Sequence, residues 1–113
     1  VAIGFSNGAN IAASLLLTHP WMLRAAVLFS PMIPFRPETD VDLSQMSVFI
    51  GAGRTDHIVS PEQTQAFASL LRDHGAKVVI HWGPGGHAIT PHHVAAAREW
   101  ILRQTSPSEA PVR

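Results

Sequence analysis

The chain opens with Val1-Ala2-Ile3-Gly4-Phe5-Ser6-Asn7-Gly8-Ala9-Asn10-Ile11-Ala12. Val1 to Ile3 is a short apolar run of β type, and Ala9 to Thr18 carries apolar residues at helical spacing. Between them lies a Gly-x-Ser-x-Gly pattern, in which small residues on both sides of Ser6 permit a sharp turn that projects the hydroxyl group. The N-terminal N–H groups of the following helix point toward the same place. The pattern therefore predicts that Ser6 is a nucleophile beside a developing oxyanion.

Strand and helix patterns alternate along the rest of the chain. Three further apolar runs are typical of strands buried in a parallel sheet: Ala25–Phe29, Ser47–Gly51 and Lys77–Trp82. Ser60, Pro61 and Gln63 predict a capped helix start, and Gly75 predicts where that helix ends. Thr90-Pro91 predicts the start of a last helix that runs to about Arg103. This alternation predicts an α/β fold with an open, mainly parallel sheet and flanking helices.

The position of the serine motif bears on domain organisation. Several strands precede such a turn in an intact enzyme of this kind, so we expect residues 1–104 to form the second half of an α/β-hydrolase domain and 105–113 to form a flexible tail. The connection from Ser30 to Met46 contains three prolines and a weak helical turn around Asp42–Met46. It leaves no room for a lid domain, so we expect an open, shallow site.

Composition excludes several classes of function. The 113 residues contain eight Lys and Arg against eight Asp and Glu, which argues against binding to nucleic acid or an anionic membrane surface. No apolar stretch is long enough to span a bilayer. The absence of cysteine excludes a disulfide scaffold, a thiolate nucleophile and a zinc–thiolate site. We expect a cytoplasmic protein that needs no metal or organic cofactor, whereas its oligomeric state stays open.

A serine hydroxyl needs a general base, and the base needs an orienting carboxylate. In α/β-hydrolases these partners follow the serine in the order acid, then histidine, on loops at the carboxyl ends of successive strands. Asp56 follows the third predicted strand in a glycine-containing loop, and His87 follows the fourth in Gly83-Pro84-Gly85-Gly86-His87. The sequence therefore predicts a catalytic triad of Ser6, Asp56 and His87.

Other residues compete for the roles of acid and base. Asp40 and Asp42 follow the second strand, where some hydrolases keep their acid, and either is an alternative to Asp56. Six further histidines compete with His87. We expect His19, His57 and His74 to be solvated and place His81 within a strand. We expect His92 and His93 to lie on the surface rather than to bind a metal, because no carboxylate or cysteine partner stands nearby.

The remaining site residues belong to the oxyanion hole and the substrate pocket. The backbone N–H of Asn7 is the expected first oxyanion donor. The second donor belongs to an earlier loop, so we expect this chain alone to be inactive. Met32, Ile33 and Ile58 are candidates for contact with an acyl group, although plain packing explains them equally well. Trp21, Trp82 and Trp100 are interpreted as packing residues rather than as a binding platform.

Three stretches resemble the bacterial phospholipase/carboxylesterase family, serine esterases related to dienelactone hydrolases and acyl-protein thioesterases. They are Gly4 to Ala12, Ser47 to Gly53 with Asp56, and His81-Trp82 with Gly86-His87. The resemblance runs from Val1 to about Arg103 and implies the same triad, acting on a small-molecule ester. Two departures from these relatives bear on the substrate. Dienelactone hydrolases use a cysteine where Ser6 stands, which argues against a lactone. The thioesterase branch more often has glutamine at the position of Asn7, which argues against long acyl-protein substrates. The turn also resembles that of polyhydroxyalkanoate depolymerases, so a polyester substrate stays open.

Two other functions fit the same sequence. A hydrolase fold can serve as a non-catalytic module that binds a ligand or a partner, against which the complete triad argues. A peptidase of the prolyl-oligopeptidase type has the same triad, and only a substrate assay separates it from an esterase.

Overall fold

The structure, a computed structural model, describes residues 1–33 and 41–104. Within them four strands form one sheet: β1 (Ala2–Phe5), β2 (Ala25–Phe29), β3 (Ser47–Gly53) and β4 (Lys77–Gly83). Three α-helices and one short 3₁₀ helix accompany the sheet: α1 (Asn7–Thr18), α2 (Pro61–Asp73), α3 (Pro91–Gln104) and Pro20–Met22. The alternative acid Asp40 and the predicted tail at 105–113 lie outside the described residues.

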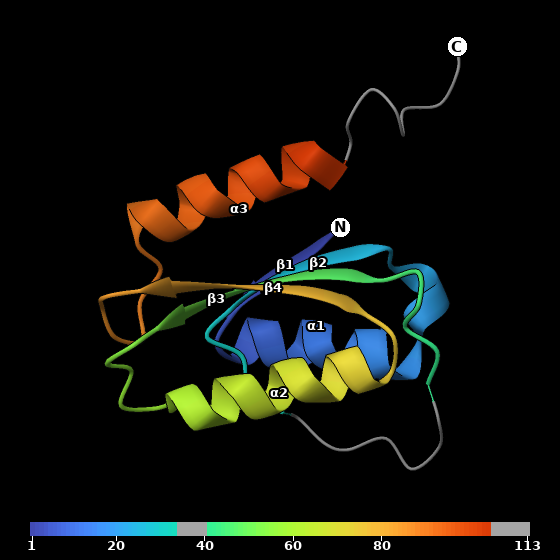
Figure 1. Ribbon diagram of the computed structural model, residues 1–113, viewed down its shortest axis with the longest axis horizontal. Helices are drawn as coiled ribbons and strands as arrows, with labels where there is room; N and C mark the ends of the chain where they lie inside the picture. Colours follow the sequence, from blue (N-terminus) through green and yellow to red (C-terminus); the bar gives the residue numbers. More distant parts are fainter. Residues whose placement is uncertain (34–40, 105–113) are drawn as a thin grey trace.

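The sheet is parallel throughout, and its strands lie in chain order, β1-β2-β3-β4. Helices α1 and α2 cover one face and α3 lies on the other (Figure 1). The predicted fold class is confirmed, and the strands and helices differ from their predicted bounds by only a few residues. Because all four strands run the same way, their carboxyl ends meet at one edge of the sheet, where loops can assemble a site.

Alternation along the strands separates two apolar cores. Ala26, Leu28, Val48 and Ile50 face α1 and α2 and pack in a cluster that includes the fully buried Phe67. The intervening residues belong to a second cluster with α3: Ala25, Val27, Phe29, Phe49, Ala97 and Trp100. Side chains of a strand point alternately to opposite faces, so uninterrupted apolar runs are what a sheet covered on both faces requires.

Local signals at the helix ends act as predicted. The Ser60 hydroxyl accepts the Gln63 N–H at 3.1 Å, and the Gln63 side chain accepts the Ser60 N–H at 2.8 Å, which completes the capping box of α2. Gly75 follows α2 with φ of 103°, a left-handed conformation that glycine adopts without steric cost. Between Asp42 and Met46 the chain makes one hydrogen-bonded turn, in which the Met46 N–H donates to the Leu43 carbonyl.

The three tryptophans differ in how far their side chains are buried. Trp100 is buried against Phe49 in the second core, and Trp82 is half-buried beneath the Arg54 guanidinium, 5.5 Å from the ring centroid. The expectation that Trp21 packs in the same way is wrong, because its side chain is largely exposed. Pro20 starts the short 3₁₀ helix there, and the ring of Trp21 meets only the neighbouring His19 ring among the aromatic contacts of the described residues.

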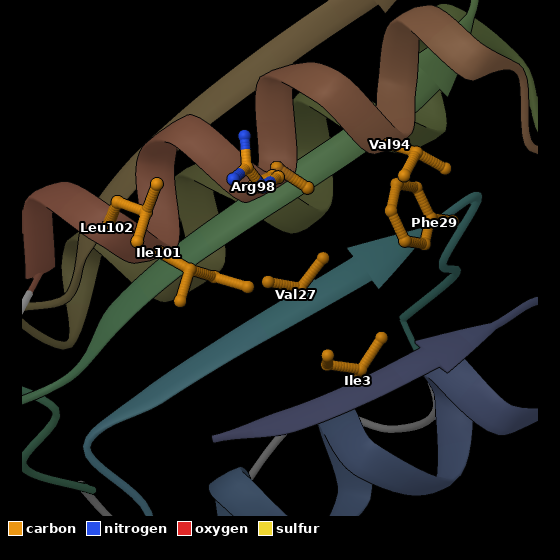
Figure 2. A pocket seen from close by; sticks show the side chains of 8 residues that line it. Ile3, Val27, Phe29, Val94, Arg98, Ile101 and Leu102 are labelled. Atoms are coloured by element: carbon orange, nitrogen blue, oxygen red, sulfur yellow. The ribbon is translucent and has the colours of Figure 1, made fainter.

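Helix α3 does not cover its whole face of the sheet. It packs on β3 and β4, and a cavity of about 340 Å³ lies between α3 and strands β1 and β2 (Figure 2). Within residues 1–33 and 41–104, none of the helices has the length and apolarity needed to cross a lipid bilayer.

Candidate active site

Ser6 joins β1 directly to α1 and has φ of 53° and ψ of −114°. A positive φ is strained for any residue with a side chain, and here the surrounding backbone holds it in place. The Ser6 N–H donates to the Phe29 carbonyl at the end of β2, and the Ser6 carbonyl accepts the Asn10 N–H in the first turn of α1, both at 2.9 Å. The turn therefore presents the hydroxyl from the carboxyl edge of the sheet.

The two glycines of the motif differ in what they allow. A Cβ atom on Gly4 would lie 2.5 Å from the backbone carbonyl of Gly8, so the turn closes only because Gly4 lacks one. A Cβ atom on Gly8 would meet nothing within 4 Å. The expectation that the turn needs small residues on both sides of Ser6 is therefore correct for Gly4 and wrong for Gly8 within this structure.

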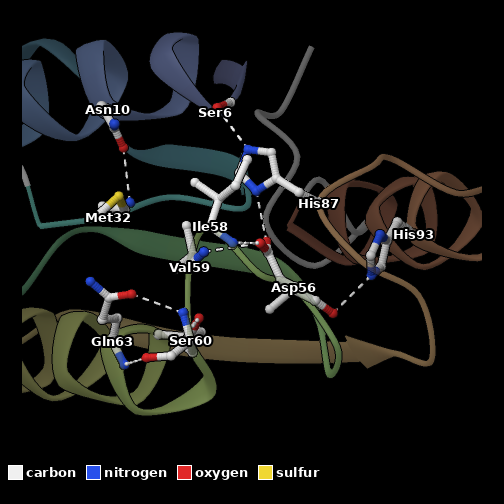
Figure 3. Close-up of polar contacts among 12 residues, drawn as sticks. Ser6, Asn10, Met32, Asp56, Ile58, Val59, Ser60, Gln63, His87 and His93 are labelled. Carbon is white, nitrogen blue, oxygen red and sulfur yellow. Dashed lines mark hydrogen bonds and ion pairs between the residues drawn. The ribbon is translucent and has the colours of Figure 1, made fainter.

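His87 lies between Ser6 and Asp56 (Figure 3). Its Nε2 atom is 2.8 Å from the Ser6 hydroxyl, and its Nδ1 atom is 2.7 Å from Oδ2 of Asp56. An ionised carboxylate can only accept hydrogen bonds, so Nδ1 carries a proton and Nε2 is free to accept the hydroxyl hydrogen. The structure thus brings together three side chains from positions 6, 56 and 87, in the arrangement that activates a serine.

The environment of Asp56 keeps its carboxyl group ionised. Burial raises the pKa of Asp56, but hydrogen bonds from the Val59 N–H, His87 and the Ile58 N–H, together with the charge of His87, outweigh it and leave the pKa below its usual value. The Ile58 and Val59 N–H groups both donate to Oδ1, at 2.7 and 2.9 Å, which leaves Oδ2 for the imidazole. The Asp56 side chain is 2% exposed and that of His87 is 17% exposed.

The loops that carry Asp56 and His87 are bonded to each other. The Arg54 N–H donates to the Gly83 carbonyl at 2.9 Å, and the Thr55 N–H donates to the Gly85 carbonyl at 3.2 Å. A Cβ atom on Gly53 would overlap the carbonyls of Gly85 and Gly86, so this close approach requires glycine at position 53. The backbone therefore sets the distance between acid and base.

Phe5 and Asn7 flank the serine. The Phe5 ring lies against the His87 imidazole, with centroids 5.4 Å apart, and limits the room in which His87 can turn. Asn7 is the first residue of α1, so its N–H has no carbonyl acceptor within the helix. Its position next to Ser6 is the one at which the sequence predicts the first oxyanion donor.

The predicted pocket residues lie in two places. Met32 follows β2, and its N–H donates to the Asn10 side-chain oxygen at 2.9 Å, one turn of helix after Ser6 (Figure 3). Met32 and Ile33 line a small cavity of about 130 Å³ with Gln63 and Ala66 of α2. Ile58 is largely exposed in the loop after Asp56. Sequence reasoning missed the role of Asn10, whose one available signal was a polar side chain in the first turn of the helix that follows Ser6.

The alternative acid Asp42 lies far from this arrangement. It precedes β3, whereas Ser6, Asp56 and His87 follow the carboxyl ends of β1, β3 and β4. Asp42 is exposed, and its carboxylate accepts the Ser44 N–H within a local turn. In a parallel sheet, residues that precede a strand and residues that follow a strand lie at opposite ends of the strands.

The prediction that His93 lies on the surface is wrong. Its side chain is 2% exposed beneath α3, and its Nε2–H donates to the Ala52 carbonyl of β3 at 3.2 Å. A Cβ atom on Gly83 would lie 2.8 Å from Nε2, so a glycine on β4 makes room for the ring. His92 is exposed, as expected. Burial, followed by the charges of His93 and His92, lowers the pKa of His81, whose ring meets that of His93 at 5.2 Å.

Across residues 1–33 and 41–104, no three side chains of His, Asp or Glu gather so that they could hold a metal ion.

Comparison with known proteins shows which proteins this chain resembles. The sequence profile of the dienelactone hydrolase family matches residues 1–100. MhqD of Bacillus subtilis (strain 168), whose name gives hydrolase as an inferred activity, is 44% identical over 100 residues, which are 88% of this chain and 50% of MhqD.

Two solved structures are similar as well. A Bacillus cereus carboxylesterase is 44% identical with a TM-score of 0.86, over 89% of this chain and 48% of the esterase. A Mesorhizobium loti carboxylesterase is 36% identical with a TM-score of 0.83, over 88% of this chain and 47% of the esterase. The chain therefore spans about half the length of these relatives.

Proposed function

The chain belongs to the dienelactone hydrolase family, and from that premise we propose that it carries the nucleophile, base and acid of a serine hydrolase for small carboxylic esters. The observation that carries the proposal is the continuous relay from the Ser6 hydroxyl through His87 to Asp56, with contacts of 2.8 and 2.7 Å. Relatives that are named carboxylesterases support an ester as the substrate.

The proposed reaction proceeds through an acyl-enzyme. Nε2 of His87 takes the Ser6 proton as Oγ attacks the ester carbonyl, and the same nitrogen then protonates the leaving alcohol. Water, deprotonated by His87, afterwards hydrolyses the acyl-serine. Asp56 accepts the Nδ1 proton throughout in a hydrogen bond, which holds the required tautomer and stabilises the imidazolium.

The N–H of Asn7 is the proposed donor to the oxyanion. One donor is half of an oxyanion hole, and loss of a donor typically costs about 10²–10³-fold in rate. We assign the second donor to the half of the relatives' fold that this chain does not span. On this account the chain alone turns over esters poorly or not at all.

The proposed acyl contacts are Met32 and Ile33 near α1 and Ile58 beside Asp56. The cavity of about 130 Å³ at Met32 and Ile33 is small, and this supports a short acyl group. The bond from the Met32 N–H to Asn10 ties that loop to the helix that begins after Ser6.

The test uses a fusion in which the half of MhqD that the chain does not match precedes this chain through a cleavable linker (the MhqD fusion). We expect it to hydrolyse p-nitrophenyl acetate and butyrate, and Ser6→Ala to lower kcat by at least about 10⁴-fold. Ser14→Ala, a serine on the same helix that donates only to the Asn10 carbonyl, is the matched control and keeps the rate. Equal turnover by the Ser6→Ala and Ser14→Ala fusions would refute the proposal. If the fusion cleaves a prolyl peptide anilide and not the esters, the peptidase hypothesis is correct and the esterase hypothesis is wrong.

A further inference from the structure

His93 is a buried polar residue that neither stability nor the proposed reaction explains. Its side chain is 2% exposed beneath α3, and its Nδ1 atom is buried with no hydrogen-bond partner among residues 1–33 and 41–104. A buried polar atom without a partner costs free energy, and an apolar side chain of similar size would avoid that cost. The reason for a histidine at this place therefore lies in what the ring contacts.

Two contacts of His93 lie at the two ends of the loop that carries His87. We define the His87 loop as residues 84–90, which join β4 to α3. A Cβ atom on Gly83, the residue before this loop, would lie 2.8 Å from Nε2 of His93, so the ring packs directly against the backbone there. Thr90 ends the loop, and its hydroxyl oxygen accepts the His93 backbone N–H at 3.2 Å. His93 is thus in contact with the chain on both sides of the proposed base.

The third contact of His93 is with the strand that leads to Asp56. The Nε2–H group donates to the Ala52 carbonyl of β3 at 3.2 Å (Figure 3). Ala52 is followed by Gly53, whose carbonyl accepts the Asp56 N–H at 3.3 Å. A single side chain therefore joins the start of α3 to the strand that carries the proposed acid.

The second half of the His87 loop needs such a support. The first half is already bonded to the loop of Asp56, because the Thr55 N–H donates to the Gly85 carbonyl at 3.2 Å. The two residues that follow His87 are exposed, so the backbone beyond the base is held where α3 begins. A side chain on a loop keeps its position only when both ends of the loop are fixed to the same framework. His93 fixes the α3 end of this loop to β3.

We propose that His93 is a positioning residue for His87 and acts through the bond from its Nε2–H to the Ala52 carbonyl. The inference rests on the proposed function, in which His87 takes the proton of Ser6. With the α3 end of the loop fixed, the imidazole stays 2.7 Å from Asp56 and 2.8 Å from the Ser6 hydroxyl. Without the bond, the start of α3 and the end of the loop shift together and both contacts lengthen. A misplacement of about 1 Å can cost about 10²-fold in rate.

The kinetic experiment compares variants of the MhqD fusion. His93→Phe keeps a flat ring but has no donor, whereas the side-chain amide of His93→Gln can place an N–H near the position of Nε2. His92→Phe is the matched control, because His92 is the neighbouring residue of α3 and is exposed. Rates with p-nitrophenyl butyrate are divided by the number of sites that a fluorophosphonate titrates at completion, so that unfolded protein is not counted.

We expect His93→Phe to lower kcat between about 10-fold and 100-fold while KM stays within about 2-fold of the parent. His93→Gln should restore kcat to within about 3-fold of the parent, because it restores the donor. His92→Phe should leave kcat within about 2-fold. A role limited to packing would lower the melting temperature and the number of titrated sites, but not kcat per site.

Proton nuclear magnetic resonance of the same fusions gives a readout that does not depend on turnover. The His87 Nδ1 proton lies in a short hydrogen bond to Asp56, so it should give a far-downfield resonance that disappears in Asp56→Asn. We expect this resonance in the parent, in His93→Gln and in His92→Phe, and its broadening or loss in His93→Phe.

Three results would overturn the inference. Equal kcat in His93→Phe and His92→Phe, with the resonance unchanged, would show that His93 only fills space. A loss of kcat that His93→Gln does not restore would show that the bond to Ala52 is not what positions the base. If the parent fusion hydrolyses no ester, the proposed function fails and the resonance alone decides. Its loss in His93→Phe would then leave the positioning of His87 by His93 standing, and its persistence would refute it.

Discussion

At the scale of single residues, the proposed chemistry depends on how the backbone holds the strained Ser6 and the buried Asp56. Ser6 keeps a positive φ because Gly4 lets the chain close and the Phe29 carbonyl anchors the Ser6 N–H. Asp56 keeps its charge because two backbone N–H groups bind one carboxylate oxygen while His87 takes the other. Neither arrangement depends on the residue alone, so the same residues outside this backbone would be an ordinary serine and an ordinary aspartate.

The ionised state of Asp56 leads to a prediction about acid stability. Its pKa in the folded state lies below the usual value of about 3.9, so folding is favoured by this group above that pH and the contribution is lost as the pH falls through the folded pKa. The free energy of unfolding, from urea titrations between pH 3 and 7, should therefore show a gap between the native chain and Asp56→Asn. That gap should be full above about pH 5 and should shrink below about pH 4.

Asp73→Asn removes an exposed carboxylate at the end of α2 and controls for the loss of one negative charge. A gap for Asp56→Asn that stays constant or widens toward acid would contradict the assignment of a depressed pKa.

Residues whose role depends on distant partners were the ones that the sequence could not predict. The pair His92-His93 is polar and stands at a helix start, where surface exposure is the ordinary outcome. His93 is buried because Gly83, on β4, leaves space for its ring. The bond from Met32 to the Asn10 side chain joins positions 22 residues apart, and no local pattern announces it.

At the scale of elements, the loops after β3 and β4 act as one unit. They are joined by bonds from the Arg54 and Thr55 N–H groups, and the carbonyls of Gly85 and Gly86 fill the space above Gly53. The separation between Asp56 and His87 is thus a property of two packed backbones. The 2.7 Å contact between His87 and Asp56 tolerates little change in that packing.

Gly53→Ala tests this coupling. The new Cβ would overlap the carbonyls of Gly85 and Gly86, so we expect a loss of about 1–3 kcal/mol in the free energy of unfolding and a fall in the kcat of the MhqD fusion. Gly85→Ala is the matched control in the facing loop, where the nearest atom to a Cβ is Thr90 Cγ2 at 3.9 Å. It should stay within about 0.5 kcal/mol of the parent. If the two substitutions behave alike, the loops are not coupled through Gly53.

Elements themselves were predictable because each carries its own local signal. Continuous apolar runs located all four strands, and the Ser60–Gln63 capping box and Gly75 located the two ends of α2. The signal weakened where tertiary contacts decide the outcome. Trp21 lies on the short 3₁₀ helix after α1 and is exposed there. No described atom lies within 4 Å of a Cβ placed on Gly8, and no local sequence signal predicts that space.

At the scale of the whole molecule, the four parallel strands form one sheet, and β1 and β4 are its outer strands among the described residues. On β4 the Arg72 guanidinium donates to the Val78 carbonyl at 3.0 Å, whereas β1 carries no charged side chain and lies beside an apolar cavity. Ser6 follows the outer strand β1, whereas Asp56 and His87 follow β3 and β4, so the site extends across the sheet from its β1 side. The proposed oxyanion donor, the Asn7 N–H, begins α1 at this same side of the sheet.

The central claim is that His87 and Asp56 activate Ser6 as the nucleophile. Its most direct test is mass spectrometry of the MhqD fusion after reaction with a fluorophosphonate, with peptide mapping of the modified residue. The account predicts one phosphonate per molecule, attached to Ser6, and at least about 10³-fold slower labelling in His87→Ala. Attachment of the phosphonate to another serine would contradict the account. So would ester turnover by a fusion whose Ser6 does not react with the fluorophosphonate.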